Sequence, residues 1–189
     1  GFGLENVGVE TRSGGILTNS FCETSVKNIY AIGDVTAPPW LAHKASHEGV
    51  LVAERIAGKK EVKPLDREKI PGCTYSNPQI ASVGLTEHQA LKLGYDVKIG
   101  NVPFLANGKA LAMGEEEGFV KTIFDGRTGE LLGAHMVGAD VTELISTFLV
   151  GKELETTFEE LTNTVFPHPT MSEILHESVL SSEEKAIHY

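Results

Sequence analysis

The chain has 189 residues, of which 41% are hydrophobic and 22% charged, a composition typical of a globular protein. The 16 basic residues are outnumbered by 26 acidic ones, and the resulting net charge of −10 argues against nucleic acid or an anionic membrane as a partner. No apolar run is long enough to cross a bilayer. The two cysteines, Cys22 and Cys73, form no C-x-x-C motif, so a disulfide framework is not expected and a reducing compartment is.

The first part of the chain contains a glycine-rich start, one short β-prone run and one helical pattern. Five glycines within residues 1–15 predict a loop. Residues 28–34 predict a buried strand that ends in Gly-Asp and presents Asp34. Small and apolar residues at helical spacing predict a helix over residues 41–57 that stops at Gly58. The charged residues 59–69 then predict a linker.

Beyond the linker the pattern changes to short strands followed by helices. Strands are predicted at residues 73–75, 80–83, 95–104, 119–124 and 131–137, the last two joined by a D-G-R-T-G hairpin turn. Thr86 and Gln89 form a capping box before a helix that stops at Gly94. Asp140 and Glu143 predict a second capped helix, whose apolar residues at i, i+3, i+4, i+7 and i+8 form one buried face.

Two shorter helices complete the pattern, one near residues 157–162 and one that begins at about Thr170. Strands followed by helices, with a hairpin among them, predict an α+β fold for residues 70–189, an antiparallel sheet with flanking helices. Residues 1–69 precede this domain as a partial α/β segment. The sequence shows neither an internal repeat nor a low-complexity tract.

The segment around His168 contains the strongest chemical pattern in the chain. Pro167 and Pro169 restrict the backbone on either side of the histidine, and Glu173 lies about one helical turn further on. A carboxylate bonded to one ring nitrogen fixes the tautomer and directs the other nitrogen at a reactant, as in a general acid–base histidine. Thr170 and Glu173 equally form a T-x-x-E capping box, so a purely structural role for Glu173 stays open.

Three motifs resemble those of the pyridine nucleotide–disulfide oxidoreductase family. His168-Pro169-Thr170-Met171-Ser172-Glu173 resembles the family's H-P-T-x-S-E signature, in which the His and Glu form the catalytic pair. Residues 29–35, Ile-Tyr-Ala-Ile-Gly-Asp-Val, resemble its A-I-G-D flavin motif. Leu41-Ala42-His43-Lys44-Ala45 is similar to the L-A-H-K-A of the dihydrolipoamide dehydrogenase branch. The resemblance implies that residues 1–69 are the C-terminal remnant of an FAD-binding domain plus a linker, and residues 70–189 the interface (dimerisation) domain.

The flavin motif also has a physical interpretation. An acid at a strand end, Asp34, can accept hydrogen bonds from the ribityl hydroxyls of FAD. The backbone N–H groups of Trp40, Leu41, Ala42 and His43 at a helix start would stabilise negative charge on the flavin N1–C2=O edge. Taken without the other motifs, Asp34 is more simply a turn or cap acid.

The resemblance implies a reaction in which dihydrolipoamide and NAD⁺ give lipoamide and NADH through FAD and a redox disulfide. In it His168 would take a proton from the dithiol, Glu173 would orient the imidazole, and the histidine would reach the disulfide of the other subunit in a homodimer. The resemblance also implies docking on the acyltransferase core of a 2-oxoacid dehydrogenase complex, through a basic binding domain. Neither nucleic acid nor a membrane is expected as a partner, and the implied compartment is the cytoplasm, or the mitochondrial matrix in a eukaryote.

Several of the family's features are missing from this sequence. It has no C-x-x-x-x-C redox pair and no G-x-G-x-x-G after a strand, which predicts a C-terminal fragment that is inactive alone. Alternatives are an isolated dimerisation module, or part of a glutathione or mercuric reductase. The ending lacks the cysteine pair of a mercuric reductase, and Phe166 stands where many lipoamide enzymes have a second histidine. His43 and His47 lie four apart without a third ligand nearby, so no metal site is expected.

Overall fold

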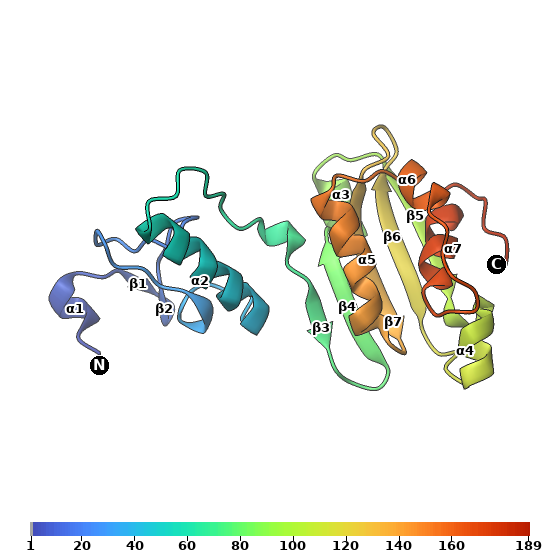
Figure 1. The fold of residues 1–189 in the computed structure, drawn as a ribbon, viewed down its shortest axis with the longest axis horizontal. Helices are drawn as coiled ribbons and strands as arrows, with labels where there is room; N and C mark the ends of the chain where they lie inside the picture. The colour runs from blue at the N-terminus through green and yellow to red at the C-terminus, as the bar shows by residue number, and fades with distance from the viewer. Residues whose placement is uncertain (1) are drawn as a thin grey trace. The chain divides into compact units, whose positions relative to one another are not determined.

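The computed structural model describes residues 2–189. They divide into two compact units, the first ending at Arg67 and the second beginning at Glu68. The boundary falls within the charged segment 59–69 that the sequence predicts as a linker. Each unit is described by itself below, with the element labels of Figure 1.

The first unit is built around one long helix. Its elements are α1 (Leu4–Val7), the short antiparallel pair β1 (Thr11–Arg12) and β2 (Gly15–Ile16), the 3₁₀ turn η1 (Gly33–Val35) and α2 (Ala42–Ile56). The helix predicted over residues 41–57 is confirmed as α2, which contacts η1.

The strand predicted over residues 28–34 is wrong. Within it only Tyr30 makes a β-bridge, to Glu23, and its last residues turn into η1. A buried strand needs neighbouring strands to satisfy its backbone groups on both sides. Among the residues that the structure describes, this segment pairs at that single position, and Asp34 is therefore presented by a 3₁₀ turn instead of a strand end.

The second unit contains a five-stranded antiparallel sheet of order β3-β4-β7-β6-β5. Its strands are β3 (Gly72–Thr74), β4 (Gln79–Gly84), β5 (Val97–Pro103), β6 (Phe119–Asp125) and β7 (Leu131–Gly138). Its helical elements are α3 (Glu87–Lys92), η3 (Phe104–Ala106), α4 (Gly108–Met113), α5 (Val141–Glu153), α6 (Phe158–Asn163) and α7 (Glu173–Ser181), after a 3₁₀ turn η2 (Arg67–Lys69). The predicted α+β fold with an antiparallel sheet and flanking helices is confirmed.

The main core lies between one face of the sheet and helices α5 and α7 (Figure 1). α5 packs against β4 and β7, and α7 packs against β5 and β6. A smaller cluster around Ala90 and Ile123 joins α3 to the opposite face. α7 lies unusually close to the sheet. Thr122 Oγ1 donates to the Ser178 carbonyl at 3.0 Å, and a Cβ built on Gly100 would overlap that same carbonyl. Contacts with the sheet thus fix the position of α7, the helix that begins at Glu173.

Two predicted caps have different outcomes. The capping box at Thr86 is confirmed, since Gln89 N–H donates to its Oγ1 at 3.3 Å and the Gln89 side chain accepts from Thr86 N–H at 2.9 Å. The side-chain cap at Asp140 is wrong. Asp140 has a φ of +59° and makes no side-chain cap bond. Side-chain capping requires an extended N-cap residue, and the left-handed conformation here prevents it.

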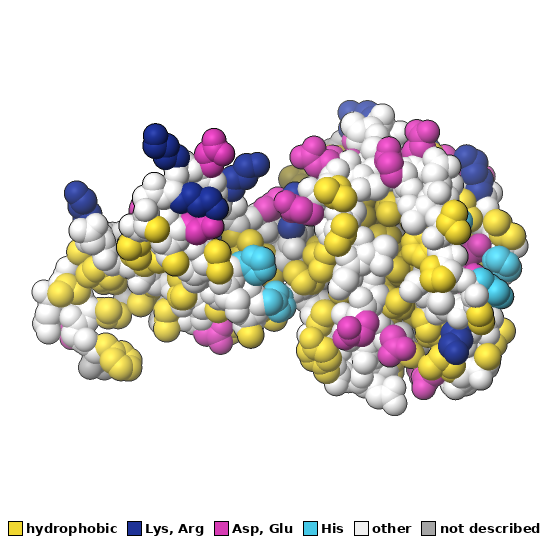
Figure 2. Space-filling view, viewed as in Figure 1, with side chains coloured by type: hydrophobic (Ala, Val, Ile, Leu, Met, Phe, Trp, Pro, Cys, Tyr) yellow, Lys and Arg dark blue, Asp and Glu magenta, His cyan; other side chains and the backbone are white. Residues whose placement is uncertain are grey.

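The surface shows no concentration of one charge sign on the face visible in Figure 2. Acidic side chains are scattered over the second unit with basic ones between them. None of the described helices is both long and apolar enough to span a bilayer.

Candidate functional site

His168 and Glu173 meet at the start of α7. The distance from His168 Nδ1 to Glu173 is 2.9 Å at Oε1 and 3.2 Å at Oε2. The histidine side chain is 78% exposed, while that of Glu173 is 29% exposed, so the carboxylate supports a ring that solutes can reach. Because Glu173 occupies the first turn of α7, the helix dipole also favours its negative charge.

The carboxylate of Glu173 is more acidic than usual. Burial raises its pKa, but the Thr170 N–H and the His168 ring outweigh that effect, and the pKa lies below its ordinary value. At neutral pH the group is therefore ionised and can only accept hydrogen bonds. The Nδ1 of His168 must then carry the hydrogen, which leaves Nε2 as the nitrogen that can exchange a proton with a reactant.

Glu173 also has a structural role, because its Oε2 accepts a hydrogen bond from Thr170 N–H at 2.9 Å. Only this half of the predicted capping box forms. The Thr170 hydroxyl donates instead to the Pro167 carbonyl at 2.7 Å, and the residue before the helix, Ser172, makes no side-chain cap bond. One carboxylate thus bonds both a backbone amide and an imidazole, so the two interpretations of the sequence motif are compatible.

Distant residues hold the His168 segment in place. Buried Asn107 donates from Nδ2 to the Thr170 carbonyl at 3.1 Å, while its Oδ1 accepts from Ala110 N–H at the start of α4. His176 on α7 donates from Nε2 to the Thr162 carbonyl at 2.9 Å. Its ring packs against that of Phe166, with 5.5 Å between the ring centroids. These residues have no special signal in the sequence, since each contact joins segments far apart in the chain or uses a common residue type.

A second histidine–carboxylate pair lies one turn further along α7. His188 Nδ1 is 3.0 Å from Glu177 Oε1, and Glu177 Oε2 accepts the N–H groups of Ile187 and His188 at 3.0 and 3.1 Å. Burial raises the pKa of Glu177, but the His188 ring and these amides outweigh it and lower the pKa below its ordinary value. This buried carboxylate fastens the end of the chain to α7.

The residues of the predicted flavin site gather around η1 and the start of α2. Asp34 is exposed in η1, and Leu41 precedes α2 as its N-cap residue without a side-chain cap bond. Trp40 is 64% exposed, and its Nε1 donates to the Thr36 carbonyl at 3.1 Å. The set of Asp34, Trp40, Leu41, Ala42 and His43 thus offers an accessible carboxylate beside the N–H groups of a helix start. The carboxylate can accept hydrogen bonds from hydroxyls of a ligand, and the N–H groups can donate to a negatively polarised edge of it.

The other candidates remain outside any site. Cys22 is buried and Cys73 is half-buried, and both are free thiols. Burial, with a smaller effect of Glu48, raises the pKa of Cys22, and burial followed by Glu143 raises that of Cys73. Within the described residues, no group of three or more His, Cys, Asp or Glu side chains could hold a metal ion.

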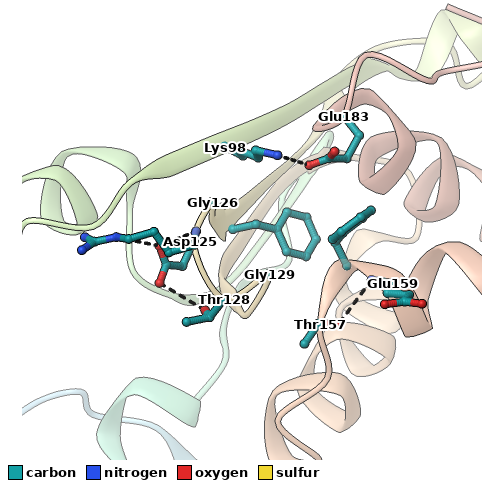
Figure 3. A pocket seen from close by; sticks show the side chains of 11 residues that line it. Lys98, Asp125, Gly126, Thr128, Gly129, Thr157, Glu159 and Glu183 are labelled. Atoms are coloured by element: carbon teal, nitrogen blue, oxygen red, sulfur yellow. Dashed lines mark hydrogen bonds and ion pairs between the residues drawn. The ribbon is translucent and has the colours of Figure 1, made fainter.

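One cavity of about 200 Å³ lies beside the turn between β6 and β7 and the start of α6 (Figure 3). Four of its charged groups form two ion pairs: Lys98 Nζ is 2.6 Å from Glu183, and Arg127 Nε is 3.9 Å from Asp125. Thr128 Oγ1 also donates to Asp125, at 3.1 Å. None of the sequence-predicted site residues lines this cavity.

Comparison with known proteins agrees with these features. The model of the pyridine nucleotide-disulphide oxidoreductase dimerisation domain matches residues 70–179, and that of the pyridine nucleotide-disulphide oxidoreductases matches residues 2–49. The chain belongs to the pyridine nucleotide-disulphide oxidoreductase family. Within it, the chain is similar to curated dihydrolipoyl dehydrogenases, which confirms the resemblance drawn from its three motifs.

The dihydrolipoyl dehydrogenase of Rhizobium etli is 59% identical over 95% of this chain and 37% of its own length. That of Zymomonas mobilis is 56% identical over 99% of this chain and 40% of its own length. Among solved structures, LpdA from Mycobacterium tuberculosis matches with a TM-score of 0.88 and 27% identity, over 95% of this chain and 39% of its own. The HOCl-induced flavoprotein disulfide reductase RclA from Escherichia coli matches with a TM-score of 0.84 and 26% identity, over 95% of this chain and 41% of its own. The chain thus spans about two fifths of these relatives.

Proposed function

We propose that the chain acts within a flavin-dependent dihydrolipoamide dehydrogenase, which converts dihydrolipoamide and NAD⁺ to lipoamide, NADH and a proton. The observation that carries the proposal is the exposed imidazole of His168, held at 2.9 Å by the ionised carboxylate of Glu173. The similarity to curated dihydrolipoyl dehydrogenases supports the choice of substrate over glutathione or mercuric ion.

His168 serves as the acid–base residue in this proposal. A thiol of dihydrolipoamide gives its proton to His168 Nε2, and the thiolate that remains is the nucleophile for disulfide exchange. Glu173 keeps the hydrogen on Nδ1 and so leaves Nε2 free of hydrogen to accept this proton. In the reverse direction the same imidazolium returns the proton to a thiolate.

The first unit supplies part of the flavin site. Asp34 would bind the ribityl hydroxyls of FAD, and the N–H groups of Trp40, Leu41, Ala42 and His43 would face the negatively polarised edge of the ring. FAD, when bound, supplies a two-electron acceptor between the dithiol and NAD⁺. The uncapped start of α2 and the exposure of Asp34 support this assignment.

The second unit makes the dimer contact in this proposal, and His168 completes the site of the partner subunit. The match of residues 70–179 to a dimerisation domain supports a homodimer. The acyltransferase core of a 2-oxoacid dehydrogenase complex is the further partner, and the net charge of −10 would suit a basic binding domain on it. The compartment is the cytoplasm, or the mitochondrial matrix in a eukaryote, with neither nucleic acid nor membrane as a partner.

The test is a substrate comparison with the FAD-loaded holoenzyme that contains this chain. NADH formation from NAD⁺ and dihydrolipoamide is expected, and NAD(P)H oxidation with glutathione disulfide or mercuric ion is expected to be slower by orders of magnitude. A preference for glutathione disulfide or mercuric ion would refute the lipoamide assignment while leaving the family intact.

A second candidate concerns the chain by itself, as a dimerisation module without catalysis. Both of its thiols have raised pKa values and neither belongs to a C-x-x-x-x-C pair, so the chain alone lacks a redox disulfide. We expect the purified 189-residue chain to show no lipoamide turnover. Turnover above the buffer rate would contradict this.

A further inference from the structure

A buried ion pair on α2 is bonded to Gly33, the residue before Asp34 in the candidate flavin site. Lys44 Nζ is 3.2 Å from Glu48 Oε1, one turn along α2, and the two side chains are only 1% and 9% exposed. Lys44 belongs to the L-A-H-K-A segment, and neither residue has a part in the proton transfer or in the flavin contacts proposed above.

The pair forms a closed set of hydrogen bonds around Gly33. Glu48 Oε2 accepts the Gly33 N–H at 2.8 Å. Lys44 Nζ donates to Thr36 Oγ1 at 3.3 Å, and Thr36 Oγ1 donates to the Gly33 carbonyl at 2.7 Å. Both backbone polar groups of the residue before Asp34 are therefore fixed by α2 and by Thr36, which is itself 3% exposed.

Gly33 is suited to this arrangement by its conformation. Its φ is +69°, which favours glycine, and a Cβ there would lie 3.2 Å from the Ala45 side chain. The turn that presents Asp34 thus lies close against α2, and both its φ and this short contact favour glycine. The Lys44–Glu48 pair bonds this turn to the helix, directly through Glu48 and by way of Thr36 through Lys44.

The charges are not what helix stability alone would favour. Lys44 is in the first turn of α2, where a cation opposes the helix dipole. A buried ion pair is also often no more stabilising than apolar side chains of the same size. The hydrogen bonds of this pair lead to the Gly33 turn, which is where the site needs a fixed backbone.

We infer that Lys44 and Glu48 are positioning residues for the flavin: together with Thr36 they hold both backbone groups of Gly33 and so set Asp34 relative to the start of α2. This inference rests on the proposed function, because it takes η1 and α2 as part of an FAD site. The two residues act through Gly33 and touch no reacting atom.

The test compares two double variants of the FAD-loaded holoenzyme. Lys44→Met/Glu48→Gln and Lys44→Met/Glu48→Leu each remove one positive and one negative charge, but only Gln keeps an oxygen that can accept the Gly33 N–H. We expect FAD to bind at least about tenfold more weakly to the Leu variant than to the Gln variant. The visible spectrum and reduction potential of the flavin that remains bound are expected to shift as well, which lower fold stability alone would not cause.

A milder change keeps the test decisive if the Leu variant does not fold. Thr36→Val removes the hydroxyl that joins Lys44 to the Gly33 carbonyl, and should weaken FAD binding about fivefold. Thr36→Ser restores the hydroxyl and should return the affinity to within about twofold of wild type.

The matched control is the exposed pair at the end of the same helix, Glu54 and Lys59, which are 2.6 Å apart. Lys59→Met/Glu54→Leu should leave FAD affinity and spectrum unchanged. The inference is overturned if the folded Lys44→Met/Glu48→Leu variant, or Thr36→Val, binds FAD like this control and with the wild-type spectrum. A wild-type holoenzyme that binds no FAD would instead refute the proposed function, and the inference with it.

Discussion

At the scale of single residues, the carboxylate of Glu173 has two partners with different purposes. Its bond to Thr170 N–H helps to start α7, and its bond to His168 orients an exposed imidazole. The two purposes can be separated experimentally, because the histidine has little of its surface buried and so contributes little to the core.

We expect His168→Gln in the holoenzyme to reduce dihydrolipoamide turnover by about 10²- to 10⁴-fold, because the general acid–base group is lost. The free energy of unfolding should change by less than about 1 kcal/mol, since the side chain is exposed. Steady-state kinetics and urea unfolding measure the two effects, with the exposed His88→Gln as control. Comparable losses of turnover and stability would indicate that the segment has only a structural role.

The lowered pKa of Glu173 predicts a pH dependence of stability. A carboxyl whose folded-state pKa is below its unfolded value of about 4.3 stabilises the fold above that value, and the contribution is lost as pH falls through the folded-state pKa. The stability difference between wild type and Glu173→Gln should therefore shrink on acidification below about pH 5. Urea titrations at several pH values measure it, with Glu116→Gln in an exposed loop as reference. A stability difference between wild type and Glu173→Gln that grows as the pH falls would contradict the prediction.

At the scale of elements, regular hydrophobic spacing predicted most of the fold. It predicted α2, α5 and the β6–β7 hairpin, because each buries one face at its characteristic period. The strand over residues 28–34 failed because β-prone residues form a strand only where partners are available. The Asp140 cap failed because its backbone is left-handed, which residue type alone does not reveal.

The candidate site was only partly predictable for a related reason. The His168–Glu173 contact spans only five residues, and both partners belong to one short motif at the start of α7, so the sequence contains it. The bond from Asn107 to Thr170 spans 63 residues, and the one from His188 to Glu177 joins the end of the chain to α7. Such contacts depend on the docking of whole elements, for which a single sequence has no local signal.

The close approach of α7 to the sheet predicts a strong effect at Gly100. Gly100→Ala would place a Cβ against the Ser178 carbonyl and should destabilise the chain by about 2–3 kcal/mol, as other overpacked sites do. Gly108→Ala, at the first residue of α4 with open space around it, is the matched control and should be neutral or stabilising by up to about 1 kcal/mol. Chemical unfolding measures both. Equal stabilities of the two variants would contradict the tight packing.

At the scale of the whole molecule, the chain consists of two compact units, and the second has its own large core. That core includes side chains from the sheet and from α5 and α7, which suits independent folding of residues 68–189. The proposed dimer contact belongs to this unit alone.

We therefore expect both the 189-residue chain and residues 68–189 alone to sediment as dimers at micromolar concentration. The reason is that a dimerisation-domain match covers residues 70–179 and lies within the second unit. Sedimentation velocity across a dilution series measures the state. A monomer at micromolar concentration for the full chain would contradict the proposed homodimer, and a monomer for residues 68–189 only would assign part of the contact to the first unit.

The two shielded thiols have a practical consequence for experiments of this kind. Because burial raises the pKa of both Cys22 and Cys73, little of either is present as the reactive thiolate at neutral pH. A cysteine introduced at an exposed position such as Ser46 should react with maleimide far faster than either native thiol. In the 189-residue chain, fluorophores or spin labels can thus be attached at single chosen positions without first removing Cys22 and Cys73.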